Sequence, residues 1–533
     1  MNRFLTLAVC LLAVRATAAE PPRLTAENID AVVAAMTLEE KAHLVVGASL
    51  SDNAEAAGQV GYTRRLVPGA AGTTYPIERL GIPPVVLADG PAGLRISPKR
   101  PGDERTYYCT GFPVGVHLGA TWNDEIIREV GEAIGNEVRE YGVDVLLAPG
   151  VNIMRNPLCG RNFEYYSEDP LLAGRTAAAF IAGVQRNGVG TSIKHFAVNN
   201  QEINRLANDS RISIRALREI YLRNFEIAVR ESQPWTVMTS YNYINGRYTS
   251  QDRQLLEDIL RDEWGFEGVV MTDWGGGVDP VAQIAAGNDM IQPGAYYQYE
   301  ALVKAVREGR LDEKALDRCV ARVLRLVVRT PRFLGCKPTE NPDLAAHARL
   351  TREVASEGFV LLKNDARTLP VAPNEKIALF GVTSYDFIAG GKGSGDVNKA
   401  YVVDLRDGLK ACGFSLDEQL DEIYLNHMKR ENARMEPARK LRWWCHYELR
   451  ANEIRDPYAL ARRAVDASNL AVITIGRNSS EGFDRHVERD FRLRIDEQAL
   501  IHAVSKTFHA AGKRVLVVLN VCGPVEIASW RDE

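Results

Sequence analysis

The stretch Gly268–Trp274 places a carboxylate where many enzymes hold a catalytic side chain. Residues Val269–Met271 are apolar and rich in β-branched side chains, and the run is too short for a helix, so it predicts a buried strand that ends at Asp273. Burying a carboxylate costs several kcal/mol unless its charge is paired or used. An acid at the C-terminal tip of a buried parallel strand is typical of the chemical end of an α/β barrel. An aspartate that caps the next helix has the same spacing, so Asp273 alone leaves both hypotheses open.

Polar side chains also follow other predicted strands of the first 335 residues. Because parallel strands point their carboxyl ends the same way, these side chains are expected to gather on one face of the sheet. The strands are predicted at Pro84–Asp89, Val143–Leu147, Thr191–Phe196, Trp235–Met238 and Asn288–Ile291, and the polar side chains expected to gather are Asp89, Lys194, His195, Tyr241 and Asp273.

Helical runs separate these strands. Residues 124–141 and 213–230 carry apolar side chains at helical spacing, and residues 173–186 form a helical run of small residues. Alternation at this pitch implies parallel strands joined by helical crossovers. We predict an α/β fold with a (β/α)8 TIM-like barrel over residues 25–335. A doubly wound open sheet is the alternative, but Asp89–Gly93 does not match the glycine-rich phosphate turn that such a sheet carries after its first strand.

A second α/β unit is predicted beyond Pro331, which ends the preceding helix. Residues 336–350 are interpreted as a linker and residues 351–533 as an α/β sandwich domain. Residues 416–462 are strongly charged and predicted helical, and Trp443 and Trp444 within them suit either packing or sugar stacking. The strands of this domain are predicted at Phe359–Leu362, Ile377–Phe380, Ala471–Ile475 and Val515–Leu519.

No cofactor is predicted. The glycine-rich loop Gly390–Asp396 lacks the GxxxxGK[ST] spacing of a phosphate loop, so a nucleotide hypothesis is weak. The chain contains no CxxC pair and no HExxH motif, so a metal is not expected.

Composition and the N-terminus restrict partners and compartment. A net charge of −4 with 25% charged residues gives no basic surplus for nucleic acid. Arg3 precedes the apolar run Phe4–Val14 and then Ala16–Ala19, which is the order of a secretory signal peptide over residues 1–19. About 11 apolar residues cannot span a bilayer, which needs roughly 20. We therefore predict no membrane anchor, and export to the periplasm or the cell exterior.

Several short motifs occur in order along residues 25–533. They are Asp89-Gly-Pro-Ala-Gly93, Gly160-Arg161-Asn-Phe-Glu164, Ser167-Glu-Asp-Pro170, Lys194-His195-Phe196, Gln201-Glu202-Ile-Asn-Arg205, Ser240-Tyr241-Asn242, Thr272-Asp273-Trp274, Gly393-Ser394-Gly-Asp396 and Ser480-Glu481-Gly-Phe-Asp484-Arg485. Each is weak alone, but together they closely resemble glycoside hydrolase family three, the β-glucosidase and β-xylosidase group. The resemblance implies a retaining, exo-acting β-glycosidase, in the first place a β-glucosidase, whose partner is an oligosaccharide or an aryl or alkyl β-glycoside.

The same resemblance implies residue roles. Asp273 would be the nucleophile, and Glu481, brought over from the second domain, would be the acid/base. Without the resemblance, Glu481 is more often a solvated loop acid than a catalyst. The residues implied in binding the sugar are Asp89, Arg161, Lys194, His195, Arg205, Tyr241, Trp274 and Ser394.

Retaining chemistry sets the expected protonation of the two carboxyl groups. It needs one ionised and one protonated group about 5–5.5 Å apart across the anomeric carbon. Lys194 and Arg205 near Asp273 are expected to keep it charged. Glu481, on a loop that is shielded once sugar binds, is expected to hold its proton nearer neutrality.

Three features depart from the family pattern. Thr272 stands where a serine is usual and keeps the hydroxyl group, and Ser480 stands where a glycine is usual. The chain ends at Glu533, soon after its last predicted strand, where relatives generally continue. We therefore expect an incomplete second domain with an exposed sheet edge, and a homodimer as the consequence.

Two other functions stay open. A β-xylosidase or α-L-arabinofuranosidase of the same family would differ in its contacts with the C6 hydroxymethyl group of the sugar. The N-acetylglucosaminidase branch is disfavoured, because Lys194-His195-Phe196 continues with Ala-Val-Asn. From another class, a non-catalytic carbohydrate-binding protein is the alternative, and the presence of both Asp273 and Glu481 argues against it.

Overall fold

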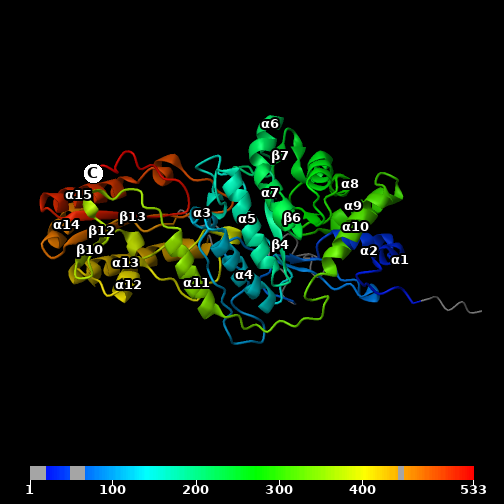
Figure 1. Cartoon of the computed structure of the whole chain (residues 1–533), viewed down its shortest axis with the longest axis horizontal. Helices are drawn as coiled ribbons and strands as arrows, with labels where there is room; N and C mark the ends of the chain where they lie inside the picture. The colour runs from blue at the N-terminus through cyan, green and yellow to red at the C-terminus, as the bar shows by residue number, and fades with distance from the viewer. Residues whose placement is uncertain (1–19, 49–65, 442–448) are drawn as a thin grey trace, which may run out of the picture.

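The computed structural model describes residues 20–48, 66–441 and 449–533. Two α/β units follow one another along the long axis of the molecule (Figure 1). The predicted signal peptide, residues 1–19, and the predicted helical Trp443 and Trp444 lie outside the described residues. Within the described ranges, no helix is both long and apolar enough to cross a membrane.

The described part of the first unit is centred on a curled sheet of six strands. Their order is β1-β2-β3-β4-β6-β9, and neighbours are parallel apart from β1 and β2, which are antiparallel. Beyond β9, single parallel bridges join Met271 to Met290 and Ile291 to Val46. The bounds are β1 Gly72–Thr73, β2 Val86–Ala88, β3 Val145–Leu146, β4 Gly190–Phe196, β6 Thr236–Thr239 and β9 Val269–Met271.

This sheet departs from the uniform parallel (β/α)8 barrel that the sequence predicts. Its first pair is antiparallel, and the segment predicted as the strand Asn288–Ile291 contributes single-residue bridges in place of a ladder. The strands predicted at residues 84–89, 143–147, 191–196, 235–238 and 269–271 are confirmed as β2, β3, β4, β6 and β9. Because they are parallel neighbours, their carboxyl ends share one edge.

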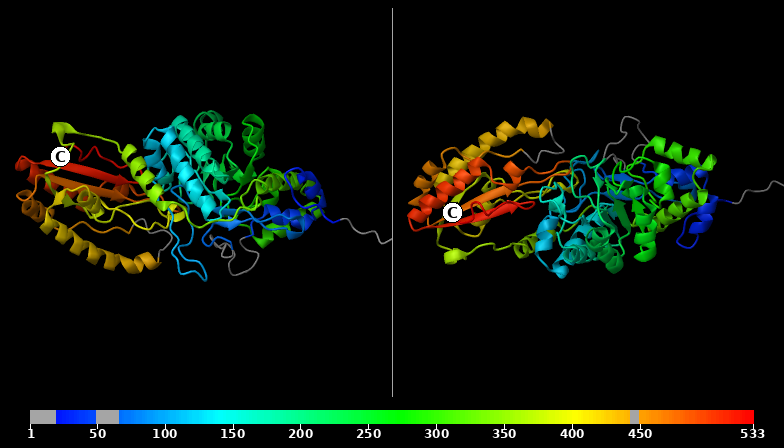
Figure 2. Two further views of the ribbon diagram at one scale, coloured as in Figure 1. Left: turned by 60° about the horizontal axis from the view of Figure 1, so that its bottom comes forward. Right: turned by 90° about the horizontal axis from the view of Figure 1, so that it is seen from above.

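Helices cover the outside of the sheet (Figure 2). Asp169 caps α5 (Pro170–Gln185) by accepting hydrogen bonds from the backbone of its first turn, and proline suits that first position. Gly183 of α5 lies so close to α4 (Asp124–Glu140) that a Cβ atom there would come 2.1 Å from the Arg128 carbonyl oxygen. The other helices are α1 Ile29–Ala35, α2 Leu38–Val45, α3 Gly115–Ala120, α6 Ile214–Ala216, α7 Arg223–Ser232, α8 Pro280–Ala285, α9 Tyr296–Arg307 and α10 Glu313–Val327, with π-helical turns at Leu217–Tyr221 and Gln254–Glu263.

Helix α11, Leu344–Glu357, begins inside the segment predicted as a linker. It packs against α3 and α4 of the first unit, where His347 Nδ1 lies 2.8 Å from Glu137 Oε1. His117 Nε2 of α3 lies 2.9 Å from the Ala355 carbonyl oxygen. The first residues of the predicted second domain therefore belong, by contact, to the first unit.

The second unit is built on a parallel sheet in the order β11-β10-β12-β13. Its long pair, β12 (Leu470–Arg477) and β13 (Arg514–Val521), is in register over all eight residues of each strand. The strand predicted at Phe359–Leu362 is wrong: these side chains are 64–69% exposed in a loop, and none of the described strands pairs with them. The remaining elements are β10 Lys376–Phe380, β11 Ser415–Leu416, α12 Leu405–Ala411, α13 Glu418–Leu441, α14 Pro457–Val465 and α15 Ile495–Ala510.

Candidate active site

Asp273 lies two residues beyond β9, at the carboxyl edge of the first sheet. Thr272 fixes the chain there, because its hydroxyl donates to the Gln292 carbonyl oxygen at 3.2 Å and accepts from the Gln292 N–H at 2.8 Å. Asp273 Oδ1 accepts from the Trp274 N–H at 2.7 Å. Asp273 Oδ2 is buried, and no hydrogen-bond donor from the described residues reaches it. One oxygen of this carboxylate is therefore held and the other is available to a ligand.

His195 approaches this available oxygen from the end of β4, which is separated from β9 by β6. Its backbone N–H donates to Asn152 Oδ1 at 2.8 Å, and its Nε2 lies 3.6 Å from Asp273 Oδ2. Burial lowers the pKa of His195 well below its usual range, and Arg161, Lys194 and Arg205 lower it further. The imidazole is therefore neutral in this site.

Asp89 and Tyr241 come from the ends of β2 and β6. Asp89 Oδ2 pairs with Arg95 Nη1 at 3.1 Å, and burial still raises the pKa of Asp89, with Arg95 and Lys194 opposing the rise. The Arg205 guanidinium lies over the Tyr241 ring, 4.3 Å from its centroid, in cation–π geometry. Burial raises the pKa of the Tyr241 hydroxyl, and the charge of Asp273 adds to the rise.

Glu481 reaches this group from the second unit, on the loop that follows β12. Its Oε2 accepts from the Ser394 N–H at 3.0 Å. Its Oε1 accepts from Arg205 Nη1 at 2.9 Å and lies 3.7 Å from Arg161 Nη1. Although it lies on a loop, Glu481 is 93% buried, since only 7% of its surface is exposed.

Arg161 and Trp274 complete the group. Arg161 Nε pairs with Glu164, and Arg161 Nη2 donates to Ser394 Oγ at 3.4 Å. The Trp274 indole N–H donates to the Ala71 carbonyl oxygen at 3.1 Å, which fixes the ring next to Asp273. All ten residues predicted from the sequence thus converge here; we call Asp89, Arg161, Lys194, His195, Arg205, Tyr241, Asp273, Trp274, Ser394 and Glu481 the interdomain site.

Several further residues support this site, although the sequence predicted no role for them. Asn152 orients His195, Glu164 pairs with Arg161, and Glu202 accepts from Arg205 Nη1 at 2.8 Å. Asn152 could have been found, because it is a polar residue shortly after the predicted strand Val143–Leu147. Glu164 and Glu202 lie inside the quoted motifs, but their partners depend on contacts that no spacing rule gives.

In the free site, the pKa shifts of the two carboxyl groups run opposite to those predicted for the reaction. Burial raises the pKa of Asp273, and the opposing charges of Arg161, Arg205 and Lys194 do not cancel the rise. Burial also acts on Glu481, but Arg161, Arg205 and the Ser394 hydrogen bonds outweigh it and hold the pKa of Glu481 far below its usual range. The reason is geometric, because Arg205 donates to Glu481 and no described cation donates to Asp273 Oδ2.

The interdomain site has the chemistry to bind a polyhydroxylated ligand. Buried atoms lacking a hydrogen-bond partner among the described residues include Asp273 Oδ2, His195 Nε2 and Arg161 Nη1. These atoms comprise both acceptors and donors, which suits hydroxyl groups that donate and accept. Across the described ranges, no group of three or more His, Cys, Asp or Glu side chains is placed to hold a metal ion.

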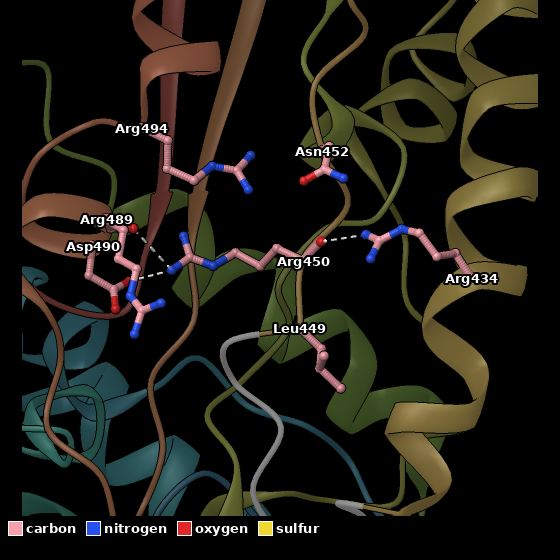
Figure 3. Close-up of a pocket in the computed structure, with 7 residues that line it drawn as sticks. All are labelled: Arg434, Leu449, Arg450, Asn452, Arg489, Asp490 and Arg494. Carbon is pink, nitrogen blue, oxygen red and sulfur yellow. Dashed lines mark hydrogen bonds and ion pairs between the residues drawn. The ribbon is translucent and has the colours of Figure 1, made fainter.

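A separate pocket of about 260 Å³ lies in the second unit and contains none of the interdomain residues (Figure 3). Arg450 and Arg434 on its wall already pair with Asp490 and Glu431. The wall consists of Arg434, Leu449, Arg450, Asn452, Arg489, Asp490 and Arg494.

Fold and site together define a two-unit α/β protein that assembles a buried pair of carboxylates from both units. Comparison with known families agrees with this description. Residues 75–326 match the N-terminal domain of glycosyl hydrolase family 3, and residues 359–533 match the C-terminal domain of the same family. The chain belongs to glycosyl hydrolase family 3.

Individual relatives extend the comparison. The structure of β-glucosidase 3B from Thermotoga neapolitana in complex with glucose is 48% identical, with a TM-score of 0.88, and the match covers 95% of this chain and 70% of that one. Thermostable β-glucosidase B of Acetivibrio thermocellus is 35% identical over 95% of this chain. An exo-α-(1→6)-L-arabinopyranosidase of Bifidobacterium breve is 37% identical over 93% of it. The chain spans 61% and 60% of the lengths of these last two relatives.

Proposed function

We propose that the chain is a retaining, exo-acting β-glycosidase, in the first place a β-glucosidase. The observation that carries the proposal is the pairing of Asp273 and Glu481 from different units in one buried site, with Arg161 and Arg205 acting on both. Such a pair is what a retaining glycosidase requires. The β-glucosidases among the relatives support glucose as the first sugar to test.

In this proposal, Asp273 Oδ2 attacks the anomeric carbon, and the glycosidic oxygen leaves with a proton from Glu481. The glycosyl–Asp273 ester is then hydrolysed by a water molecule that Glu481 deprotonates, which restores both groups. The sugar is held by Asp89, Arg161 and the other interdomain residues.

In the free site the pKa of Asp273 is raised and that of Glu481 is lowered, which is opposite to the direction that the reaction needs. The charge of Glu481 is one of the causes that raise the pKa of Asp273, so the two groups influence each other's titration. We propose that the reactive form has Asp273 ionised and Glu481 protonated.

An L-arabinopyranoside is the second candidate substrate. It is supported by the arabinopyranosidase among the relatives. This sugar lacks the C6 hydroxymethyl group of glucose, as xylose does, so the contacts around that carbon decide the preference. A panel of aryl β-glucoside, β-xyloside, α-L-arabinopyranoside and α-L-arabinofuranoside measures it directly.

Retention is tested by NMR of the first-formed sugar, which we expect to be the β anomer of glucose. The α anomer appearing first would contradict the two-carboxylate retaining mechanism. Binding of the same glycosides without turnover of any of them would favour a non-catalytic carbohydrate-binding protein.

We also propose that the first sheet closes as a barrel. The bridges from Met271 to Met290 and from Ile291 to Val46 support a barrel-like closure of the first sheet, with the site at its carboxyl end.

Export from the cell is also part of the proposal, and it is supported by the signal-peptide pattern of residues 1–19. Cell fractionation with detection of the processed N-terminus tests it.

A further inference from the structure

The position of Glu481 depends on how its loop is attached to the first unit. Asp273 is fixed by the first sheet, whereas Glu481 follows β12 of the second sheet. The separation of two catalytic carboxyl groups must be held closely, because a change of about 1 Å can cost about 10²-fold in rate. Something must therefore fasten the Glu481 loop across the boundary between the units.

Asp484, three residues after Glu481, makes such an attachment. Its Oδ1 accepts from the Gly160 N–H at 3.1 Å and from the Glu202 N–H at 2.9 Å. Its Oδ2 accepts from the Ile203 N–H at 3.1 Å. One carboxylate of the second unit thus binds three backbone donors of the first unit, in hydrogen bonds strengthened by its charge.

Residues on either side of Asp484 also form hydrogen bonds with the first unit. The Arg485 N–H donates to the Leu158 carbonyl oxygen at 2.7 Å, and the Ser479 hydroxyl donates to the Gly160 carbonyl oxygen. The fit leaves no space, since a Cβ atom on Gly160 would come 1.7 Å from the Phe483 carbonyl oxygen. The loop therefore lies directly on the Gly160 turn.

Glu202 connects this attachment to the charge of Glu481. Its Oε2 accepts from the Gly482 N–H at 2.7 Å and from Arg205 Nη1 at 2.8 Å. The same Arg205 nitrogen donates to Glu481 Oε1. Displacing the loop would therefore disturb both the place and the protonation of Glu481.

We propose that Asp484 is a positioning residue that fastens the Glu481 loop to the first unit and so sets the geometry of proton transfer. The carboxylate of Asp484 is directed at backbone donors of the Gly160 and Glu202–Ile203 turns, so it does not serve as an alternative acid/base. This inference rests on the proposed function, because it assigns Asp484 a part in the step that Glu481 performs.

The test compares Asp484→Ala and Asp484→Asn with Glu488→Gln, a control whose carboxylate is on the same segment and 75% exposed. We expect Asp484→Ala to lower kcat/KM for cellobiose by about 10²-fold, toward the loss from removing general acid catalysis. For a dinitrophenyl β-glucoside, whose leaving group needs no proton, we expect less than about tenfold loss. Asp484→Asn, which keeps one acceptor oxygen, should lie between, and Glu488→Gln should match the wild type.

Hydrogen–deuterium exchange supplies a readout that does not depend on activity. In Asp484→Ala, the Gly160, Glu202 and Ile203 amides should exchange faster, while amides of β4 and β9 should not change. Equal losses on both substrates, or unchanged exchange at these three amides, would overturn the inference. Wild-type protein that turns over neither substrate would overturn the proposed function, and the exchange result would still decide whether Asp484 fastens the loop.

Discussion

Asp273 and Glu481 experience the same two arginines but end with opposite pKa shifts. The charges of Arg161 and Arg205 lower the pKa of both groups, but Glu481 also accepts hydrogen bonds from Arg205 and Ser394, whereas no described donor reaches Asp273 Oδ2. At the same time, the negative charge of Glu481 is one of the causes that raise the pKa of Asp273.

We expect Glu481→Gln to lower the pKa of Asp273. The substitution removes a neighbouring negative charge, so ionisation of Asp273 becomes easier. The measurement is kcat/KM for a dinitrophenyl β-glucoside against pH, which reports groups of the free enzyme. The acid limb should move to lower pH in the variant, and an unmoved or raised limb would contradict the coupling.

The two carboxylates should also differ in how their loss depends on the leaving group. Asp273→Ala removes the nucleophile, so every β-glucoside should lose activity by several orders of magnitude. Glu481→Ala should lose about 10²–10⁴-fold on cellobiose, while forming the glycosyl-enzyme from a dinitrophenyl glucoside. That intermediate lacks its base and should accumulate until azide releases it as the β-glycosyl azide. No azide effect, with equal loss on both substrates, would mean that another residue is the acid/base.

At this scale, the sequence predicted which residues form the site but not their state. The motifs predicted that Asp273, Glu481 and the other residues of the interdomain site lie together, because most of them stand at the end of a strand or in a loop after one. The pKa directions depend on which nitrogen donates to which oxygen, and that is decided by packing between units. Asp484 illustrates the limit, since its donors come from residues 160, 202 and 203.

At the scale of elements, apolar runs located most strands of both sheets but not how the strands pair. Residues 376–380, 470–477 and 514–521 form β10, β12 and β13 where short apolar runs predict them. The run Phe359–Leu362 is equally apolar but is an exposed loop. An apolar, β-branched sequence forms a strand only where another strand lies beside it to accept and donate backbone hydrogen bonds. The antiparallel pairing of β1 with β2 could not be predicted from the sequence either, because a strand of two residues leaves no apolar pattern to recognise.

A buried acid that contacts the chain just after β10 makes stability depend on pH. Glu453 Oε1 accepts from the Val382 N–H at 3.1 Å, and burial raises the pKa of Glu453 to about 8. Glu497 and Asp496 nearby favour the neutral form, whereas Arg494 opposes it. Between the unfolded pKa of 4.5 and about 8, the folded state therefore binds a proton that the unfolded state has lost.

We expect this group to stabilise the fold fully below pH 4.5 and to lose that contribution as pH rises toward 8. The slope is at most about 1.4 kcal/mol per pH unit. Glu453→Gln mimics the protonated side chain, so its free energy of unfolding should fall less steeply than that of the wild type over this range. Urea unfolding at several pH values measures both slopes, and parallel slopes would contradict a raised pKa for Glu453.

At the scale of the whole molecule, the two units are joined where the chemistry occurs. Arg161 and Arg205 of the first unit contact Glu481 of the second. The Asp484 carboxylate of the second unit accepts three hydrogen bonds from backbone N–H groups of the first. A ligand in the interdomain site therefore interacts with both units at once. One edge of the second sheet is formed by β13, the last of its described strands in the order β11-β10-β12-β13.

The loop of residues 359–368 contacts β13 and the end of the chain. Arg514 of β13 donates to the Thr368 carbonyl oxygen at 3.1 Å, and Lys363 donates to the Arg531 carbonyl oxygen at 3.0 Å. Residues 359–362, directly before Lys363, expose four large apolar side chains. Edge strands and contiguous apolar surface both promote association.

We expect the 533-residue chain to form dimers or larger assemblies through this side as its concentration rises. Leu361→Lys places a charge on a side chain that is 64% exposed, so it should weaken association without loss of core packing. Leu334→Lys is the matched control, because Leu334 is equally exposed but lies on the first unit, just beyond α10. Sedimentation velocity over a range of concentrations should show a smaller associated fraction for Leu361→Lys alone. A wild-type chain that stays monomeric at high concentration would contradict the expected association. An equal effect of both substitutions would exclude this side as the contact, because association through it should be weakened by a charge at residue 361 and unaffected by one at residue 334.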